Sequence, residues 1–358
     1  MDGAGPNSAG LVQGSDGTLY GTTYLGGAFA LGTVFKLSAD GSFLSLIHSF
    51  NDGDGVNPHA GLVRGSDGAF YGTTFTGAGA SGEGSVFRIS ADGSSFSVLH
   101  RFARATSDGA NPNAGLVQGR DGAFYGTTLN GGASGAGTVF KVTADGSFTL
   151  LHSLDADSGY NPRAPLVQGA DGAFYGTAYQ GGVFGVGTVF KVSADGSSLF
   201  VLRSFDTATG AFPYAGLVQG PDGALYGTTA GGGASNVGTV FRVSADGSSL
   251  SLLHSFDSVD STNGAYPQAA LVQGRDGAFY GTTLQGGVNC NGAGCGTVFR
   301  VSPDGSSFSV LHRFAGAPAD GGTPNANLVL GNDGAFYGTT TQGGASDGGV
   351  VFRQPFTP

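Results

Sequence analysis

The chain is built from seven copies of one unit, and this repetition restricts its fold more than any other feature. Each copy contains a motif close to GLVQGxDGAFYGTT, and the leucines of successive motifs are 51, 54, 50, 51, 54 and 57 residues apart. A regular period of this length is typical of proteins in which one supersecondary unit is stacked repeatedly. The motif leucines are Leu11, Leu62, Leu116, Leu166, Leu217, Leu271 and Leu328.

Each copy predicts four short strands, with the sequences LVQ, AFYGTT, TVFKVS and a last strand such as SFSVLHRF. One Asp-Gly turn joins the first strand to the second, and another joins the third to the fourth. Asp-Gly between apolar runs is a strong hairpin signal, because both residues accept positive φ. Adjacent apolar residues such as Phe70 and Tyr71 point to opposite faces, so each meander must be covered on both faces.

These features predict an all-β fold, a seven-bladed β-propeller that forms a single domain over residues 1–358, with four antiparallel strands per blade. The last copy ends at VFRQPFTP, without a second Asp-Gly turn or an LHSF strand. The last blade is therefore expected to lack its outer strand unless residues beyond this sequence, or another copy of the chain, supply it. A β-solenoid is the alternative fold, but solenoid coils are usually shorter and lack two Asp-Gly hairpins per repeat.

The composition limits the partners of the chain. The formal net charge is −10 and the sequence pI is about 4.8, whereas nucleic-acid binding requires clustered Lys and Arg. No apolar run approaches the roughly 20 residues of a membrane-spanning helix. The first residues, MDGAGPNSAG, lack the basic and hydrophobic segments of a signal peptide. We therefore expect neither nucleic-acid binding nor membrane insertion.

The combination of NPxAGLVQGxDGxFYGTT, a Gly-Gly loop, GTVFKVSADG and LHSF resembles the bacterial tandem repeat called GloVer. The resemblance covers nearly the whole chain, and the pairing of YGTT with GTVFK is specific. It implies a repeat architecture and a secreted or surface-anchored location. It implies no activity, so no catalytic residue is assigned from it.

Residues that recur in every copy are interpreted as scaffold, because a binding site usually needs a given side chain once. The third strand carries a cation at one position, and we expect these cations to pair with the turn aspartates. The last strand carries a histidine that we expect to be half-buried between blades. The cations are Lys36, Arg88, Lys141, Lys191, Arg242, Arg300 and Arg353, and the histidines are His48, His100, His152, His254 and His312.

Function is expected at the loops that vary between copies. The loop between the second and third strands and the connection to the next blade leave the same end of the sheet, and they carry nearly all the variation. Loops held by a rigid scaffold are the usual location of binding residues. Aromatic rings beside polar groups suit sugar stacking, although such rings would also cap blade interfaces. The candidate ligand-binding residues are His59, Glu83, Tyr160, Arg163, Tyr179, Phe184, Tyr214 and Tyr266.

We expect no cofactor, and calcium is the one metal that the loops suggest. Asp52 and Asp54 in NDGDG, like Asp155 and Asp157 in LDADSG, place carboxylates at alternate positions. Calcium needs six to eight oxygen ligands, and no third acid follows at the required spacing.

The two cysteines, Cys290 and Cys295, lie in an extended loop, LQGGVNCNGAGC. Zinc would need two further ligands nearby, and redox enzymes favour a CxxC spacing at the start of a helix. A disulfide that rigidifies the loop is the favoured interpretation, and it indicates an oxidising compartment.

The sequence therefore predicts an extracellular or cell-surface bacterial binding module, with a glycan or protein ligand and no evident catalysis. One alternative is a glycan-active hydrolase or lyase that uses Glu83 and His59, since glycoside hydrolysis requires acid–base groups. Another is a structural surface protein that forms homo-oligomers through the open edge of the last blade, because an unpaired strand accepts a further strand.

Overall fold

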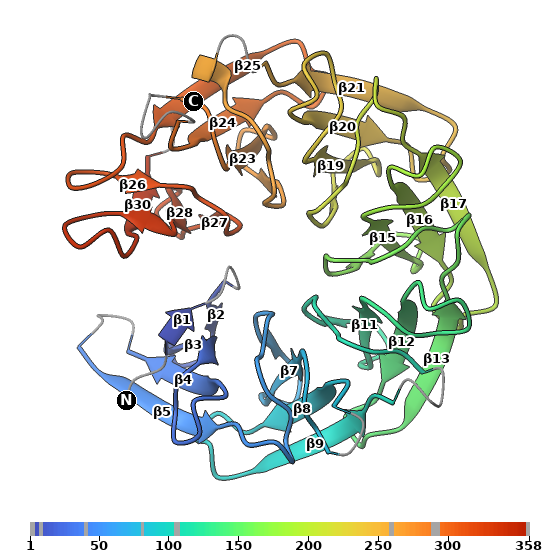
Figure 1. Ribbon diagram of the computed structural model, residues 1–358, viewed down its shortest axis with the longest axis vertical. Helices are drawn as coiled ribbons and strands as arrows, with labels where there is room; N and C mark the ends of the chain where they lie inside the picture. The colour runs from blue at the N-terminus through green and yellow to red at the C-terminus, as the bar shows by residue number, and fades with distance from the viewer. Residues whose placement is uncertain are drawn as a thin grey trace. The chain divides into compact units, whose positions relative to one another are not determined.

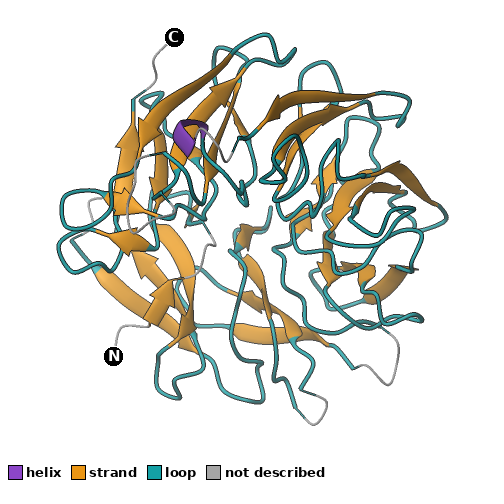
Figure 2. Ribbon diagram, turned by 45° about the horizontal axis from the view of Figure 1, so that its top comes forward, coloured by secondary structure: helices purple, strands orange, loops and turns teal. Residues whose placement is uncertain are grey.

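The computed structural model describes residues 4–6, 10–38, 42–79, 82–103, 108–257, 261–287 and 294–355. These residues form β-strands joined by turns and loops, with one short 3₁₀ helix, η2 (Ser261–Asn263), among them (Figure 2). No described helix is long and apolar enough to cross a membrane. The chain consists of two compact units, residues 1–174 with 192–199, and residues 175–191 with 200–358. The expectation of a single domain over residues 1–358 stays a prediction.

The predicted seven-bladed β-propeller is confirmed, and Figure 1 labels most of its strands. Blade 1 contains β2 (Val12–Gln13), β3 (Leu19–Leu25), β4 (Thr33–Leu37) and β5 (Leu44–Ser49), and blade 2 contains β6 (Val63–Arg64), β7 (Phe70–Thr74), β8 (Ser85–Ile89) and β9 (Phe96–Arg101). Blade 3 contains β10 (Val117–Gln118), β11 (Phe124–Thr128), β12 (Thr138–Val142) and β13 (Phe148–Ser153), and blade 4 contains β14 (Val167–Gln168), β15 (Phe174–Ala178), β16 (Thr188–Val192) and β17 (Leu199–Ser204). Blade 5 contains β18 (Val218–Gln219), β19 (Leu225–Thr229), β20 (Thr239–Val243) and β21 (Leu250–Ser255), and blade 6 contains β22 (Val272–Gln273), β23 (Phe279–Thr283), β24 (Thr297–Val301) and β25 (Phe308–Arg313).

Blade 7 has three strands, β27 (Val329–Leu330), β28 (Phe336–Thr339) and β30 (Val351–Gln354), so the missing outer strand is also confirmed for the described residues. Each blade is an antiparallel meander in which neighbours along the chain pair with one another. Additional short pairings join the start of a blade to the end of its second strand. They involve β1 (Ala4–Pro6) with β3, and β26 (Gly321–Gly322) with β29 (Gln342–Gly343).

The glycine of YGTT is required by the register of the second and third strands. In blade 2, Gly72 pairs with Phe87, and the ring of Phe87 lies across the glycine. A Cβ atom on Gly72 would lie 2.5 Å from Cζ of Phe87 and 3.0 Å from Cδ2 of Leu62. Only glycine therefore lets the first and third strands pack over the second, which explains why the motif keeps this residue in every copy.

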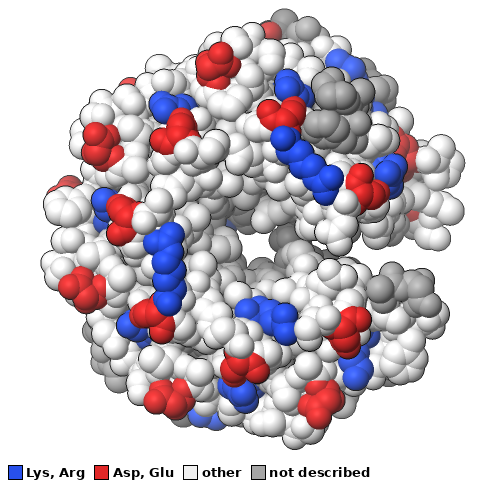
Figure 3. All heavy atoms as spheres, turned by 180° about the vertical axis from the view of Figure 1, so that it is seen from behind, with Lys and Arg blue, Asp and Glu red and all other residues white. Residues whose placement is uncertain are grey.

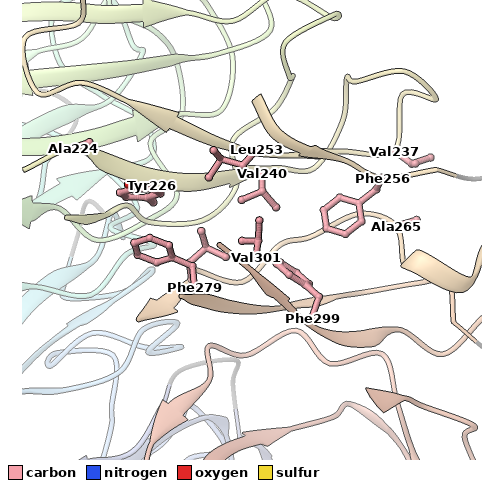
Figure 4. Packing of buried hydrophobic residues seen from close by; sticks show 11 residues of the cluster. Ala224, Tyr226, Val237, Val240, Leu253, Phe256, Ala265, Phe279, Phe299 and Val301 are labelled. Atoms are coloured by element: carbon pink, nitrogen blue, oxygen red, sulfur yellow. The ribbon is translucent and has the colours of Figure 1, made fainter. Parts of the chain in front are cut away.

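Consecutive blades within each unit are joined by aromatic stacking. The tyrosine of YGTT in one blade stacks on the first residue of the second strand in the next blade, as Tyr71 does on Phe124 at 3.8 Å between ring centroids. Tyr226 stacks in the same way on Phe279 at 4.0 Å, within the cluster between blades 5 and 6 that Figure 4 shows. The apolar residues on both faces of the strands are thus buried against neighbouring blades, as the sequence predicts.

Among the described contacts, three of the recurring histidines pack between blades, as predicted. His48 stacks on Phe96 with ring centroids 3.8 Å apart, and His100 stacks on Phe148 at 3.7 Å. The ring of His254 lies parallel to that of Phe308 at 3.5 Å. His48 and His100 also bond to Asp54 and Asp108, and His312 bonds to Asp320.

Among the described residues, predicted ion pairs at the first Asp-Gly turn are present in blades 2, 3, 5, 6 and 7. Arg88 donates from Nη2 to Asp67 at 2.9 Å, and its Nε donates to the hydroxyl of Tyr71 at 3.1 Å. Tyr71 donates in turn to Asp67 at 2.8 Å. Figure 3 shows carboxylates in red beside Lys and Arg side chains in blue on one face of the molecule. The remaining pairs are Lys141–Asp121, Arg242–Asp222, Arg300–Asp276 and Arg353–Asp333.

Candidate functional site

Each blade from the second onward is preceded by an entry segment of the form GxxPxA, with asparagine before the proline in blades 2 to 4. Its backbone is held in the same way in both units. In the entry segment 55–60, the N–H of Asn57 donates to the carbonyl of Leu31, and its carbonyl accepts from the N–H of Phe75. The hydroxyl of Thr22, in the YGTT motif of blade 1, donates to the carbonyl of Ala60 at 3.1 Å. The entry segment is therefore fixed to the preceding blade as well as to its own.

The entry segment 210–215 repeats this pattern of bonds. The N–H of Phe212 donates to the carbonyl of Val186 at 2.7 Å, and the carbonyl of Phe212 accepts from Ala230 at 3.0 Å. Thr177 donates to the carbonyl of Ala215 at 3.1 Å. Because the backbone of these two entry segments is held in the same way, the differences between them come from their side chains.

Two positions on this frame carry most of the side-chain variation. The loop position is the residue between Pro and Ala of the entry segment, and the strand-end position is the residue that follows YGTT. The loop position holds His59, Asn113, Arg163, Tyr214, Gln268 and Asn325 in blades 2 to 7. The strand-end position holds Tyr24, Phe75, Leu129, Tyr179, Ala230, Leu284 and Thr341 in blades 1 to 7.

In the first unit, the two positions meet in an aromatic cluster. The ring of His59 lies 4.8 Å from the ring of Tyr24, at an angle of 72°, and 4.8 Å from the ring of Phe75. All three side chains are half-buried. Burial lowers the pKa of His59 below its usual value of 6.5, so the imidazole is neutral near pH 7. We call Tyr24, His59 and Phe75 the first aromatic cluster.

In the second unit, the strand-end residue Tyr179 and the loop-position residue Tyr214 form a second aromatic cluster with Phe212, which precedes the proline of the entry segment. The ring centroids of Tyr179 and Phe212 are 5.2 Å apart, and those of Tyr179 and Tyr214 are 6.1 Å apart with the rings at 88°. These separations are those of rings in direct contact. The structure thus brings together the predicted residues Tyr179 and Tyr214.

Phe212, Tyr24 and Phe75 were not among the predicted binding residues, although each belongs to a cluster. A signal for Phe212 exists in the sequence, because it replaces the asparagine of the NP dipeptide found in blades 2 to 4. The signal for Tyr24 and Phe75 is their place directly after YGTT.

The other predicted residues lie at several places. Glu83 is half-buried, and its carbonyl accepts the N–H of Asn111 at 2.7 Å. The structure places no hydrogen bond between Glu83 and His59, whose described ring contacts are with Tyr24 and Phe75. The proposed acid–base pair of Glu83 and His59 stays a prediction.

Tyr160 and Tyr266 are half-buried in entry segments, as is Arg163 at the loop position of blade 4. Tyr160 stands where other copies carry buried small residues such as Ala110. Phe184 is 59% exposed at the tip of the β15–β16 loop, next to Val183, whose N–H donates to Ser204 at the end of β17.

The carboxylates of the predicted calcium loops bind neighbouring side chains. Asp54 accepts from Asn51 at 2.6 Å and bonds to His48, while Asp155 accepts from the hydroxyl of Ser158 at 2.7 Å. Within the part of the chain that the structure describes, no group of three or more His, Cys, Asp or Glu residues is arranged to hold a metal ion.

Cys295 is buried and packs in the cluster between blades 6 and 7. Its carbonyl accepts the N–H of Thr323 at 2.8 Å, as the equivalent carbonyls do in other blades. Cys290 lies outside the described residues, so the disulfide stays a prediction.

The blades and their bonding define a seven-bladed β-propeller with side-chain variation confined to loops at one end of each sheet. The chain belongs to the Gloeobacter/Verrucomicrobia repeat family, whose model matches residues 1–118, 66–294 and 258–357. The resemblance to the GloVer repeat is thereby confirmed. No curated protein matches the chain.

Solved structures share the fold at low sequence identity. The extracellular domain of a protein assigned to the hybrid two-component systems of B. thetaiotaomicron has a TM-score of 0.61 at 10% identity, and the match covers 98% of this chain and 38% of that one. Oligogalacturonate lyase from Vibrio parahaemolyticus has a TM-score of 0.60 at 11% identity, with 98% and 89% covered. A Bacteroides uniformis protein assigned as a 6-phosphogluconolactonase has a TM-score of 0.56 at 17% identity, with 87% and 86% covered. The chain spans less than half the length of the first of these proteins.

Proposed function

We propose that the protein is an extracytoplasmic binding module that holds a glycan at its aromatic clusters. The proposal is supported by a contrast within the entry segments. Their backbone hydrogen bonds are the same from blade to blade, whereas the side chains at the loop and strand-end positions differ. A scaffold that needed only blade packing would repeat its residues there, as it does in YGTT and GTVF. Variation at positions in mutual contact is what a binding site on a rigid frame requires.

The chemistry of the clusters favours binding over catalysis. Both are formed by half-buried rings, and the second consists of two tyrosines and a phenylalanine, with no carboxylate or imidazole. Tyrosine offers an apolar ring for stacking and a hydroxyl for hydrogen bonds, which is the combination that a sugar ring uses. The extracellular domain among the solved structures supports an extracytoplasmic location, which remains part of the proposal.

A glycan array followed by calorimetry on the best oligosaccharide tests this function. Tyr214→Ala is expected to weaken binding at least tenfold, because burial of an aromatic side chain contributes about 1.5–3 kcal/mol. Gln268→Ala, at the loop position of the next blade, is the matched control and is expected to bind as the wild type does. Binding that is identical in both variants would contradict the proposal.

The same experiment separates the other functions. Release of shortened or unsaturated oligosaccharides during the incubation would identify a hydrolase or a lyase instead. An array with no glycan signal, together with capture of a specific surface protein, would identify a protein ligand.

A second candidate function is assembly through the open edge of blade 7, because one specific observation favours it. Strand β30 pairs with β28 on one side, whereas the third strand of each other blade also pairs with a fourth. An unpaired edge of this kind accepts a strand from another molecule. We propose a second copy as the source of that strand.

Sedimentation velocity at increasing concentration tests this assembly. A peptide with the fourth-strand sequence SFSVLHRF, from residues 307–314, is expected to dissociate the oligomer by occupying the edge. A scrambled peptide serves as the control. A monomer at all concentrations would contradict the assembly without affecting the glycan proposal.

A further inference from the structure

The asparagine of the NP dipeptide has two roles in the scaffold. Asn57, Asn111 and Asn161 have φ angles of 55°, 58° and 56°, in the left-handed region that asparagine tolerates better than most residues. The side-chain Nδ2 atom of each donates to the carbonyl at the strand-end position of the preceding blade. These bonds run to Tyr24, Phe75 and Leu129 at 3.1, 3.1 and 3.0 Å. Asparagine therefore suits both the backbone and the contact between blades.

In blades 5, 6 and 7 this position is held by Phe212, Tyr266 and Thr323, with φ angles of 57°, 55° and 53°. The side chain of Phe212 fits neither role of the asparagine. The φ of Phe212 lies in the left-handed region, where a bulky residue is strained. Its ring also cannot donate the hydrogen bond that asparagine makes to the preceding blade. The backbone bonds of Phe212 to Val186 and Ala230 match those of the asparagines, so the chain has not changed its path to accommodate the ring.

A second substitution accompanies Phe212 and makes room for its ring. In blade 3, Asn130 follows the strand-end position and donates from Nδ2 to Oδ1 of Asn111 at 3.2 Å. The equivalent residue in blade 5 is Gly231, where a Cβ atom would lie 3.1 Å from Cδ2 of Phe212. The bonded Asn–Asn pair of blade 3 is thus replaced by a Phe–Gly pair in blade 5.

The ring of Phe212 joins a surface suited to an apolar ligand face. The ring of Tyr179 contacts that of Phe212 at 5.2 Å and that of Tyr214 at 6.1 Å, so the cluster offers apolar ring faces. A ligand must lie on the rings, as the C–H face of a pyranose does when it stacks on an aromatic side chain. The cluster itself carries no charge, and the chain has a net charge of −10, which disfavours acidic sugars.

We propose that the second aromatic cluster is a stacking platform for neutral pyranose units of a glycan, and that Phe212 is kept there for binding at the expense of fold stability. This inference rests on the proposed function and assigns it a ligand class and a central residue. A binding role for Phe212 can be distinguished from a packing role by one substitution. Replacing Phe212 with the asparagine of the repeat should raise the stability of the fold and lower the affinity for the glycan.

The test compares Phe212→Asn with wild type, using neutral hexasaccharides of glucose, xylose and mannose and an oligogalacturonate of the same length. The variant is expected to melt roughly 1–4 °C higher, because it regains the asparagine backbone preference and hydrogen bond. Its affinity for the best neutral hexasaccharide is expected to fall at least tenfold. Phe212→Asn combined with Gly231→Asn restores the pair of blade 3 and should strengthen both effects. Thr323→Asn, the same change at the equivalent position of blade 7, is the control for binding and should leave affinity unchanged.

The outcomes separate this inference from the proposed function. A wild type that binds none of these glycans, nor any on the array, refutes the proposed function and the inference with it. Glycan binding that survives Phe212→Asn leaves the proposed function standing and overturns the inference. A variant that melts lower than wild type identifies Phe212 as a packing residue and also overturns it. Binding of oligogalacturonate alone overturns the neutral ligand class.

Discussion

The glycine of YGTT offers a sharp test of the register between strands, and Gly126 in blade 3 is the best site for it. Gly126 pairs with Phe140, and a Cβ atom there would lie 2.6 Å from Cζ of Phe140 and 2.8 Å from Cδ2 of Leu116. Both neighbours are buried, so neither can move away without disturbing the packing around it. Gly126→Ala is therefore expected to destabilise the fold.

The magnitude follows from the cost of overpacking a core. An added methyl group that cannot be accommodated costs about 1–3 kcal/mol. Alanine also restricts the unfolded chain relative to glycine, which favours folding by about 0.4–1 kcal/mol. Gly115→Ala restricts the unfolded chain in the same way but causes no overpacking, because the φ of Gly115 is not positive and the nearest atoms to an added Cβ would be 3.6 Å or more away. The equivalent residue in blade 6 is already Ala270.

Urea denaturation followed by tyrosine fluorescence measures the two variants against wild type. Gly115→Ala is expected to be neutral or slightly more stable, and Gly126→Ala to be less stable than Gly115→Ala by about 1–3 kcal/mol. Because the unfolded-state effect is common to both, their difference isolates the clash with Phe140 and Leu116. Equal free energies of unfolding for the two variants would refute the register and the role assigned to this glycine.

Three further predictions concern charges and the cysteine loop. Arg242→Gln removes a 2.7 Å ion pair with Asp222 and should lower the free energy of unfolding by about 0.5–1 kcal/mol at low salt, less at 1 M salt, without changing glycan affinity. Burial lowers the pKa of His254 to about 4, while an unfolded histidine titrates near 6.5. The free energy of unfolding should therefore fall as pH decreases from 6.5 to 4, by about 1 kcal/mol after allowance for solvent screening at this partly exposed ring. His254→Gln should remove this pH dependence, as measured by urea denaturation at several pH values. Mass spectrometry of unreduced secreted protein should find Cys290 and Cys295 linked, and reduction should cost about 2 kcal/mol of stability; two free thiols would contradict the linkage.

The fold was predictable because each of its determinants is repeated. The Asp-Gly turns mark two hairpins per copy, and residues such as Phe70 and Tyr71 require cover on both faces, which neighbouring blades supply. The pairing of Arg88 with Asp67 was predictable for the same reason, since both residues recur at fixed positions in the motif. Residues that recur at fixed positions of the motif therefore predict contacts that recur in each blade.

The composition of the aromatic clusters was harder to predict. Tyr24 and His59 belong to different blades, and their contact depends on the bonds that hold the entry segment 55–60 against both blades. Tyr160 and Phe184 carry rings of the same kind in loops of the same class. Residue type alone therefore does not separate rings that join a cluster from rings that do not. The positive φ of Phe212 was also hidden, because it follows from the backbone path of the asparagine that Phe212 replaces.

The replacement of asparagine by Phe212 allows the cost of a residue to folding to be compared with its expected contribution to binding. A bulky residue in the left-handed region costs about 1–2 kcal/mol, and the lost asparagine hydrogen bond costs on the order of 1 kcal/mol. The sum is a substantial part of the 5–15 kcal/mol by which a typical domain is stable. Copies with Asn57, Asn111 and Asn161 demonstrate that the same backbone is available without this cost. Tyr266 and Thr323 share this left-handed backbone in blades 6 and 7, and Phe212 differs from them in its described ring contact with Tyr179. A ligand stacked on that cluster would offset the cost to folding, because burial of an aromatic side chain contributes about 1.5–3 kcal/mol.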